Sequence, residues 1–209
     1  PYTTLFRSLM LFKNNTLYSI GHGHKTVEEF IDELQSFSIQ FLVDVRTSPY
    51  SKWAPHFNRG IIEHWLSQAG IKYGYMGDII GGKPQNDSCY DDEGYFDYHK
   101  MAEIPRFKEG LNRLVVANNK HFIVGIMCTE TDPTQCHRSK LIGRELYFNH
   151  EINMSHIITI GKSVKQSVIM TELTKGEWLP EGNLFGSCEP PFFRSRKSYR
   201  DYNLEIDEY

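Results

Sequence analysis

The chain has 209 residues, of which 40% are hydrophobic and 23% are charged, which is enough apolar material for one domain of ordinary size. Its 23 Lys and Arg residues against 26 Asp and Glu residues give a formal net charge of −3, which excludes a globally basic nucleic-acid-binding surface and leaves a local basic patch open. Mean hydropathy is −0.47, and no apolar run approaches the roughly 18–20 residues of a membrane helix, so we expect a soluble globular protein.

Residues 1–9 precede Met10 and lack the apolar stretch of a secretory signal, and we interpret them as a non-native leader. We expect a single domain over 10–209, with its core at about 16–161 and a peripheral C-terminal extension over 162–209, where Pro and Gly punctuate the pattern. Four cysteines in a chain of this length do not form a disulfide framework, and without a signal peptide they predict a reducing, cytoplasmic location.

Strand and helix signals alternate along the first part of the chain. Residues 16–20 are β-prone and stop at Gly21, which predicts a first strand. Thr26 and Glu29 form a capping-box pattern that opens a helix. Residues 41–45 are largely apolar and predict a second, buried strand.

The middle of the chain adds a helix, a strand and a long connection. Apolar residues at helical spacing predict a helix over 61–69, which Gly70 ends. Residues 71–75 predict a third strand. Residues 81–98 are rich in Gly, Asn and Asp and predict a long polar loop, which in a compact domain is usually functional or mobile.

The remaining elements complete the alternation. A helix opens near Pro105, a strong strand covers 122–127, a helix covers 141–148 and a fifth strand covers 156–160. The apolar strands lack period-two alternation, as expected for a parallel sheet that is covered on both faces. The sequence therefore predicts an α/β protein with about five mostly parallel strands and helices on both faces.

Side chains suited to catalysis and ligand binding follow several of the predicted strands. Ligands of open α/β sheets bind beyond the carboxyl ends of the strands, so we expect these side chains to meet at one edge of the sheet. The residues selected by this rule are His22 and His24 after the first strand, Asp44 and Arg46 after the second, and Cys128, Glu130, Cys136, His137 and Arg138 after the fourth.

The segment after the fourth strand is the most informative. Cys136 and Arg138 lie at or just before a predicted helix N-terminus, where free backbone N–H groups attract an anion and Arg138 adds a bidentate fork. The same field would lower the pKa of the Cys136 thiol and favour thiolate chemistry. Glu130 and His137 are of the types that exchange protons near neutral pH.

Three stretches together have the pattern of a known family: Ile20-Gly21-His22, Val43-Asp44-Val45-Arg46 and Cys128-x-Glu130-x-Asp132-Pro133-x-x-Cys136-His137-Arg138. On these residues the chain resembles, from about Tyr18 to Ile160, the family called "domain of unknown function 488", and Tyr95-x-Asp97-Tyr98 looks similar too. The resemblance implies a Rossmann-like α/β fold, a three-layer sandwich, and brings no established reaction or substrate. The family commonly has Ser or Thr after Gly-His, and in this chain His24 offers a different group nearby.

We predict a small cytoplasmic enzyme that acts on an anionic substrate, either a nucleotide, a nucleic-acid base or a phosphorylated metabolite. Cys136 or Cys128 is the candidate nucleophile, and Glu130 and His137 are the candidate proton carriers. The candidate substrate-binding residues are Arg138, Arg46, His22, His24 and Asp44. The alternative is a noncatalytic ligand-sensing or nucleic-acid-associated module that uses the same residues.

Other interpretations apply to individual residues. Cys128 could simply be a small buried residue that ends a strand. We expect the side chains of Asp44 and Arg46 to point to opposite faces, with no ion pair between them. Cys128, Cys136 and His137 are of zinc-ligand type, but no CxxC pair is present and adjacent Cys and His residues rarely reach one metal. No cofactor is therefore predicted; zinc is a secondary interpretation, and a redox disulfide between the two cysteines ranks after zinc.

Overall fold

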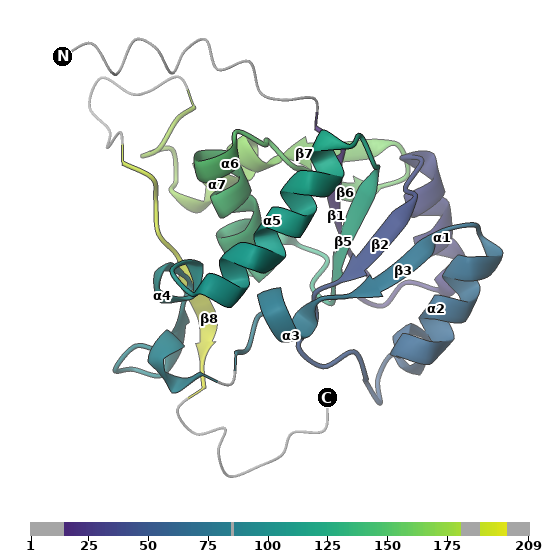
Figure 1. The fold of residues 1–209 in the computed structure, drawn as a ribbon, viewed down its shortest axis with the longest axis horizontal. Helices are drawn as coiled ribbons and strands as arrows, with labels where there is room; N and C mark the ends of the chain where they lie inside the picture. The colour runs from purple at the N-terminus through teal and green to yellow at the C-terminus, as the bar shows by residue number, and fades with distance from the viewer. Residues whose placement is uncertain (1–14, 85, 181–188, 200–209) are drawn as a thin grey trace.

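A computed structural model of the chain describes residues 15–84, 86–180 and 189–199, and its helices and strands are labelled in Figure 1. The leader predicted at 1–9 lies outside these residues. Within the described ranges, no helix combines the length and the apolar character that crossing a membrane requires.

Six strands form the main sheet, in the order β3-β2-β5-β1-β6-β7. The first five in this order run parallel, and β7 pairs antiparallel with β6 at one edge. The strands are β1 (Leu17–Gly21), β2 (Phe41–Asp44), β3 (Lys72–Tyr75), β5 (Val124–Cys128), β6 (Ser155–Thr159) and β7 (Lys162–Lys165). All five predicted strands are present, so the predicted mostly parallel sheet is confirmed, and β7 extends it.

Helices cover both faces of this sheet, with α1 and α2 on one face and α5 and α6 on the other (Figure 1). The helices are α1 (Val27–Ser36), α2 (Arg59–Gln68), α3 (Gly77–Ile80), α4 (Tyr98–Ala102), α5 (Pro105–Asn119), α6 (Arg144–His150) and α7 (Gln166–Leu173). The predicted capping box opens α1, because the Thr26 side chain accepts from the Glu29 N–H and the Glu29 carboxylate accepts from the Thr26 N–H. The α/β three-layer class is confirmed.

Each face of the sheet has its own apolar core, and successive strand residues enter alternate cores. In β5, Met127 lies in the core of α1 and α2, whereas Ile126 and Cys128 lie in the core of α5 and α6. In β1, Ile20 lies in the first of these cores and Leu17 in the second. The position at which a strand ends therefore decides which face the next polar side chain reaches.

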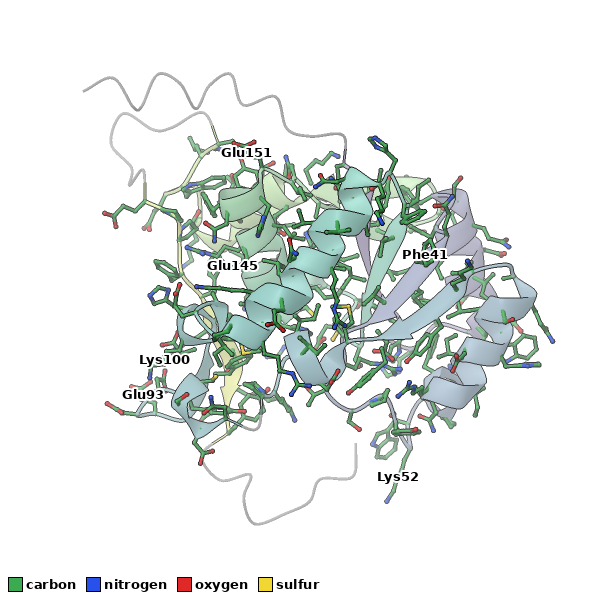
Figure 2. All side chains as sticks on the ribbon, in the orientation of Figure 1. Phe41, Lys52, Glu93, Lys100, Glu145 and Glu151 are labelled. Atoms are coloured by element: carbon green, nitrogen blue, oxygen red, sulfur yellow. The ribbon has the colours of Figure 1, made fainter. Side chains whose placement is uncertain are left out.

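The segment 81–98, predicted as a loop, contains the short helical turn η3 (Asp87–Cys89) and the strand β4 (Tyr95–Asp97). Strand β4 pairs antiparallel with β8 (Arg194–Ser198), which comes from the far end of the chain. Glu93 and Lys100 mark this region in Figure 2, on the side away from α1 and α2. The residues assigned from sequence to a peripheral extension thus contribute β7 to the main sheet and β8 to a second, two-stranded sheet.

Candidate functional site

The residues selected from the sequence lie at the carboxyl edge of the parallel sheet. Figure 2 helps to find this edge: Phe41 is the first residue of β2, and Lys52 lies beyond the other end of that strand. All of them except His24 fall into two clusters on opposite faces. The thiol cluster, on the face of α5 and α6, consists of Cys128, Glu130, Cys136, His137 and Arg138, and the arginine cluster, on the face of α1 and α2, consists of His22, Asp44 and Arg46. Within the part of the chain that the structure describes, no side-chain hydrogen bond or ion pair joins the two clusters, and a backbone bond from the His22 N–H to the Cys128 carbonyl, at 3.0 Å, holds them side by side.

The two thiols of the thiol cluster share one carboxylate oxygen. Cys128 Sγ lies 3.0 Å and Cys136 Sγ 3.2 Å from Glu130 Oε2. His137 Nδ1 lies 3.9 Å from the first sulfur and 3.7 Å from the second. The ligand atoms of Cys128, Cys136 and His137 all lie within 4.8 Å of one another. Four groups that can gain or lose a proton therefore meet beyond the end of β5.

A short helical turn brings the two cysteines together. Strand β5 ends at Cys128, and Asp132 then caps the turn η4 (Pro133–Gln135) by accepting from the Thr134 N–H at 2.8 Å. The turn reverses the chain, so that Cys136 returns to the sulfur at the strand end. A helical segment, the π-helical η5 (Arg138–Gly143), begins two residues later, close to the predicted helix start.

Gly21 and Arg138 fix the backbone at Glu130. A Cβ at position 21 would lie 1.9 Å from the Glu130 carbonyl oxygen, so only glycine lets β1 approach this loop. Nη2 of Arg138 donates to the same carbonyl. The glycine of the Gly-His motif therefore serves the thiol cluster, although His22 itself belongs to the arginine cluster.

Arg138 is 1% exposed and directs its guanidinium to internal partners. Its Nε donates to Cys136 Sγ at 3.2 Å, and its Nη1 donates to Ser19 Oγ at 3.0 Å. The anion that this arginine contacts within the protein is thus the sulfur of Cys136. Its predicted role as a substrate ligand stays a prediction.

A buried polar network behind Arg138 was not found from the sequence. Ser19 Oγ lies 2.6 Å from His156 Nδ1, and Gln166 Oε1 lies 2.7 Å from His156 Nε2. Gln166 Nε2 donates to the Ser139 carbonyl at 3.0 Å, so its Oε1 accepts from His156 and Nδ1 of that ring accepts from Ser19. Burial is the main cause that lowers the pKa of His156 to about 4, and the charge of Arg138 is the second cause. The ring is therefore neutral, and each of its nitrogens has a hydrogen-bond partner.

The two thiols differ in their protonation. Burial alone would raise the pKa of Cys136, but a hydrogen bond from Cys128 and the charges of Arg138 and His137 bring it well below its usual value. The hydrogen bond to Cys136, followed by burial, raises the pKa of Cys128 well above its usual value. Cys136 is therefore the thiolate of the pair, and Cys128 is the thiol that donates to it.

Glu130 connects the thiols to solvent. The residue as a whole is exposed, while its carboxyl end lies against both sulfurs. Burial of this carboxyl, followed by the charge of Cys136, raises the pKa of Glu130. A carboxyl with a raised pKa exchanges protons closer to neutral pH than an ordinary glutamate does.

His137 is buried, and only one of its ring nitrogens has a partner. Nδ1 faces the two sulfurs, and Nε2 has no hydrogen-bond partner among the described residues. The ring packs under Gly82, where a Cβ would lie 2.9 Å from Nδ1. The segment 81–98 therefore covers the thiol cluster at this glycine.

In the arginine cluster, Asp44 and Arg46 form a buried ion pair at 2.6 Å, so the expectation that they point apart is wrong. Strand β2 ends at Asp44, and the Arg46 N–H donates to Asp44 Oδ1 at 3.0 Å, which turns the chain and folds the arginine back onto the carboxylate. Arg46 Nη2 also donates to the Phe57 carbonyl at 2.8 Å, and Tyr73 Oη donates to Asp44 Oδ2 at 2.8 Å. These two predicted substrate ligands thus hold one another.

His22 is 1% exposed, and its Nδ1 lies 3.1 Å from the Gly23 carbonyl oxygen. Nδ1 therefore carries the proton, and Nε2 accepts from Arg46 Nη1 at 3.3 Å. Burial, followed by the charge of Arg46, lowers the pKa of His22 to about 3. The ring stacks on Phe57 with centroids 4.3 Å apart. His22 is neutral and internally bonded, whereas His24 is exposed and lies in neither cluster.

Tyr98, the first residue of α4, lies beside the thiol cluster and was not selected from the sequence. It is 6% exposed, and burial, followed by the negative charge at Cys136, raises its pKa well above the usual value. The resemblance at Tyr95-x-Asp97-Tyr98 is the signal that could have found it. The pairing of β4 with β8 positions this tyrosine.

Cys128, Cys136 and His137 are the residues that could hold a metal, since their donor atoms are close enough and suit zinc. This group contains three protein donors, which is the number in a catalytic zinc site, whereas structural zinc sites use four. The donor atoms of the adjacent Cys136 and His137, Sγ and Nδ1, lie 3.7 Å apart, which the sequence did not lead us to expect.

The fold and the thiol cluster define an α/β protein with a two-cysteine site at the carboxyl edge of a parallel sheet. The model of the family described as "Domain of unknown function DUF488" matches residues 26–144, more than half of the chain, and the chain belongs to this family. No curated protein and no solved structure matches the chain. The matched residues include the whole thiol cluster but neither Ser19 nor His156.

Proposed function

We propose that this chain is an enzyme whose nucleophile is the thiolate of Cys136. The observation that carries the proposal is the 3.2 Å contact from Arg138 Nε to Cys136 Sγ, made by a guanidinium that is itself buried. The thiolate is the nucleophilic form of cysteine, and a fixed neighbouring cation favours it. The charge of Arg138 therefore supports a reactive cysteine at this buried position.

Glu130 and His137 act on the protons and the orientation of the sulfurs. Glu130 contacts both thiols through Oε2 and is also exposed, so we assign to it the exchange of protons between the thiols and water. His137 Nδ1 faces Cys136 Sγ at 3.7 Å and gives the thiolate a second polar contact.

The proposed substrate is a small anion, and two cations support this class: Lys140, whose charge interacts with that of Cys136, and Arg196, whose charge interacts with that of Lys140. Arg138 and Arg46 direct their donors to internal partners, so neither is assigned to the substrate. Burial lowers the pKa of half-buried Lys140; the negative charges of Cys136 and Asp132 oppose this shift, and the positive charge of Arg196 adds to it. Lys140 and Arg196 form no ion pair with the described residues. We assign the negative charge of the substrate to them.

The pH dependence of alkylation tests the nucleophile. With iodoacetamide on the native protein, we expect Cys136 to be modified first, with a half-maximal rate well below the pKa of about 8.5 of a free thiol. Cys136→Ser should remove this fast phase. Cys89→Ser, at a buried cysteine next to Met101 and outside the thiol cluster, should keep it. Peptide mass mapping identifies the modified residue, and a fast phase at another cysteine, or none at all, contradicts the proposal.

The charge of the alkylating reagent tests the substrate class. Anionic iodoacetate should react faster, relative to neutral iodoacetamide, than it does with a free thiol, because the cations attract it. Lys140→Gln and Arg196→Gln should each lower this rate ratio severalfold. Lys162→Gln, at an exposed position on β7, is the control that should leave the ratio unchanged. If neither variant lowers the ratio, the anionic substrate is excluded.

A noncatalytic binding module is the second candidate, and the burial of the thiols favours it. Cys136 is 1% and Cys128 6% exposed, and buried cysteines are commonly inert. In this case alkylation would proceed only when the fold opens, so its rate would rise steeply in urea concentrations below the unfolding transition. An enzyme should react at a rate that urea changes little in this range.

A further inference from the structure

We propose that Cys128 and Cys136 close a reversible disulfide during turnover, and that the reaction of the thiol cluster is thiol–disulfide exchange with a small, anionic disulfide. The inference rests on the proposed function, because the same Cys136 thiolate starts the reaction. It adds the class of reaction, the class of substrate and a role for the second thiol.

The two thiols are positioned to bond to each other. Their Sγ atoms lie within 4.8 Å, and both contact Oε2 of Glu130, at 3.0 and 3.2 Å. A disulfide has an S–S distance of about 2.05 Å, so the sulfurs have less than about 3 Å to close. Cys128 ends β5 and Cys136 follows the turn η4, so the disulfide would join two segments that this turn already brings together.

The surroundings of the two sulfurs are unequal, as thiol–disulfide exchange requires. Exchange begins with a thiolate and ends with attack by a second thiol that is deprotonated later. Arg138 Nε donates to Cys136 Sγ, which favours the first thiolate there. Cys128 is the more exposed of the two and lies closest to the Glu130 carboxyl, which can accept its proton.

The steps balance without an additional oxidant. The Cys136 thiolate attacks one sulfur of the substrate R–S–S–R, the substrate S–S bond breaks, and the leaving R–S⁻ takes the proton of the Glu130 carboxyl. The Glu130 carboxylate then takes the proton of Cys128, whose thiolate attacks the Cys136 sulfur, and the second R–S⁻ leaves with that proton. Two electrons pass from the protein dithiol to the substrate, which is released as two thiols. An excess of a small thiol reverses the sequence and restores the dithiol.

A metal ion is the competing occupant of the same residues. The guanidinium of Arg138 already holds a positive charge at Cys136 Sγ, and it repels a second cation at that sulfur. Three protein donors, Cys128, Cys136 and His137, fall short of the four that structural zinc sites use, although a catalytic zinc needs only three. These observations favour dithiol chemistry, and zinc is an outcome of the test.

Glutathione provides the probe, since its oxidised form is a small anionic disulfide. The reduced full chain is analysed for zinc, equilibrated in buffers with different ratios of oxidised to reduced glutathione, quenched by alkylation and mapped by mass spectrometry. We expect a Cys128–Cys136 disulfide, a mass lower by two hydrogens and no lasting glutathione adduct. Cys128→Ser should trap one glutathione on Cys136, because the resolving thiol is missing. Cys89→Ser should behave as the unchanged chain.

The outcomes separate this inference from the proposed function. If Cys136 reacts with iodoacetamide but retains glutathione in the unchanged chain, the inference is overturned and the nucleophile stands. If Cys136 reacts with neither reagent and Cys136→Ser collects glutathione on Cys128, the proposed function fails along with the order of steps. One equivalent of zinc that protects both thiols until a chelator removes it also overturns the inference.

Discussion

Arg138 places a charge inside the core and directs it at a single sulfur atom. Its Nε donates to Cys136, and its Nη1 donates to Ser19, which is hydrogen-bonded to His156. Because His156 is neutral, the thiolate is the anionic partner that the guanidinium contacts directly through its Nε. A substitution of Arg138 that removes its charge but keeps a hydrogen-bond donor should therefore change the pKa of Cys136 first.

We predict that Arg138→Gln raises the apparent pKa of Cys136 by at least about one unit, since an opposite charge in contact typically shifts a pKa by 1–3 units. The measurement is the pH dependence of the iodoacetamide rate, with circular dichroism to establish that the variant is folded. Arg113→Gln, at an exposed position on α5, is the matched control. An unchanged pH profile in folded Arg138→Gln would show that the arginine does not act on the thiol.

The residues of the thiol cluster could be selected from the sequence because they follow one strand within one short segment. Its supporting residues could not, because Ser19 and His156 come from β1 and β6 and become neighbours only through the parallel register that pairs them. The expected separation of Asp44 and Arg46 was wrong because residues two positions apart lie on the same face of a strand, and because the chain turns at Asp44, where the Arg46 N–H donates to its carboxylate.

At the scale of elements, the central strands were predictable and the peripheral ones were not. Strand β5 is a continuous apolar run buried on both faces, which periodicity detects well. Strands β4 and β8 are short, and β8 reads Arg-Ser-Arg-Lys-Ser, which has no apolar pattern. Their pairing joins segments about a hundred positions apart, as the hydrogen bond between Phe96 and Ser195 shows, and no local signal reports it.

Ser195 connects β4 and β8, and its removal should destabilise the two-stranded sheet that positions Tyr98. The Phe96 N–H donates to Ser195 Oγ at 2.9 Å in a buried position. We predict that Ser195→Ala leaves this N–H unpaired, at a cost of about 1–3 kcal/mol. Amide hydrogen exchange should then accelerate in β4 while the main sheet keeps its protection. Ser163→Ala, at an exposed position on β7, should change neither, and equal exchange in both variants contradicts the prediction.

For the molecule as a whole, two buried neutral histidines tie stability to pH. Burial lowers the pKa of His22 to about 3 and that of His156 to about 4, from 6.5 in the unfolded chain. Below pH 6.5 the unfolded chain therefore binds protons that the folded chain does not. The stabilisation that these neutral rings provide is complete above pH 6.5 and is lost as the pH falls toward 4 and 3.

We predict that the free energy of unfolding in urea falls between pH 7 and pH 5 by about 2 kcal/mol for each of these histidines. His156→Gln should reduce the fall, because one protonation site of the unfolded chain is removed. His24→Gln, at an exposed position, should retain the full fall. A free energy of unfolding that stays constant over this range in the unchanged chain would contradict the argument.

The place of β1 in the strand order has a practical consequence for anyone who trims the chain. This strand lies between β5 and β6, in the middle of the sheet, yet it precedes the residues 26–144 that the family model matches. A fragment cut to those limits would leave one side of β5 with a bare row of backbone N–H and carbonyl groups. Such an edge recruits other chains, so the fragment should precipitate where the longer polypeptide stays dispersed.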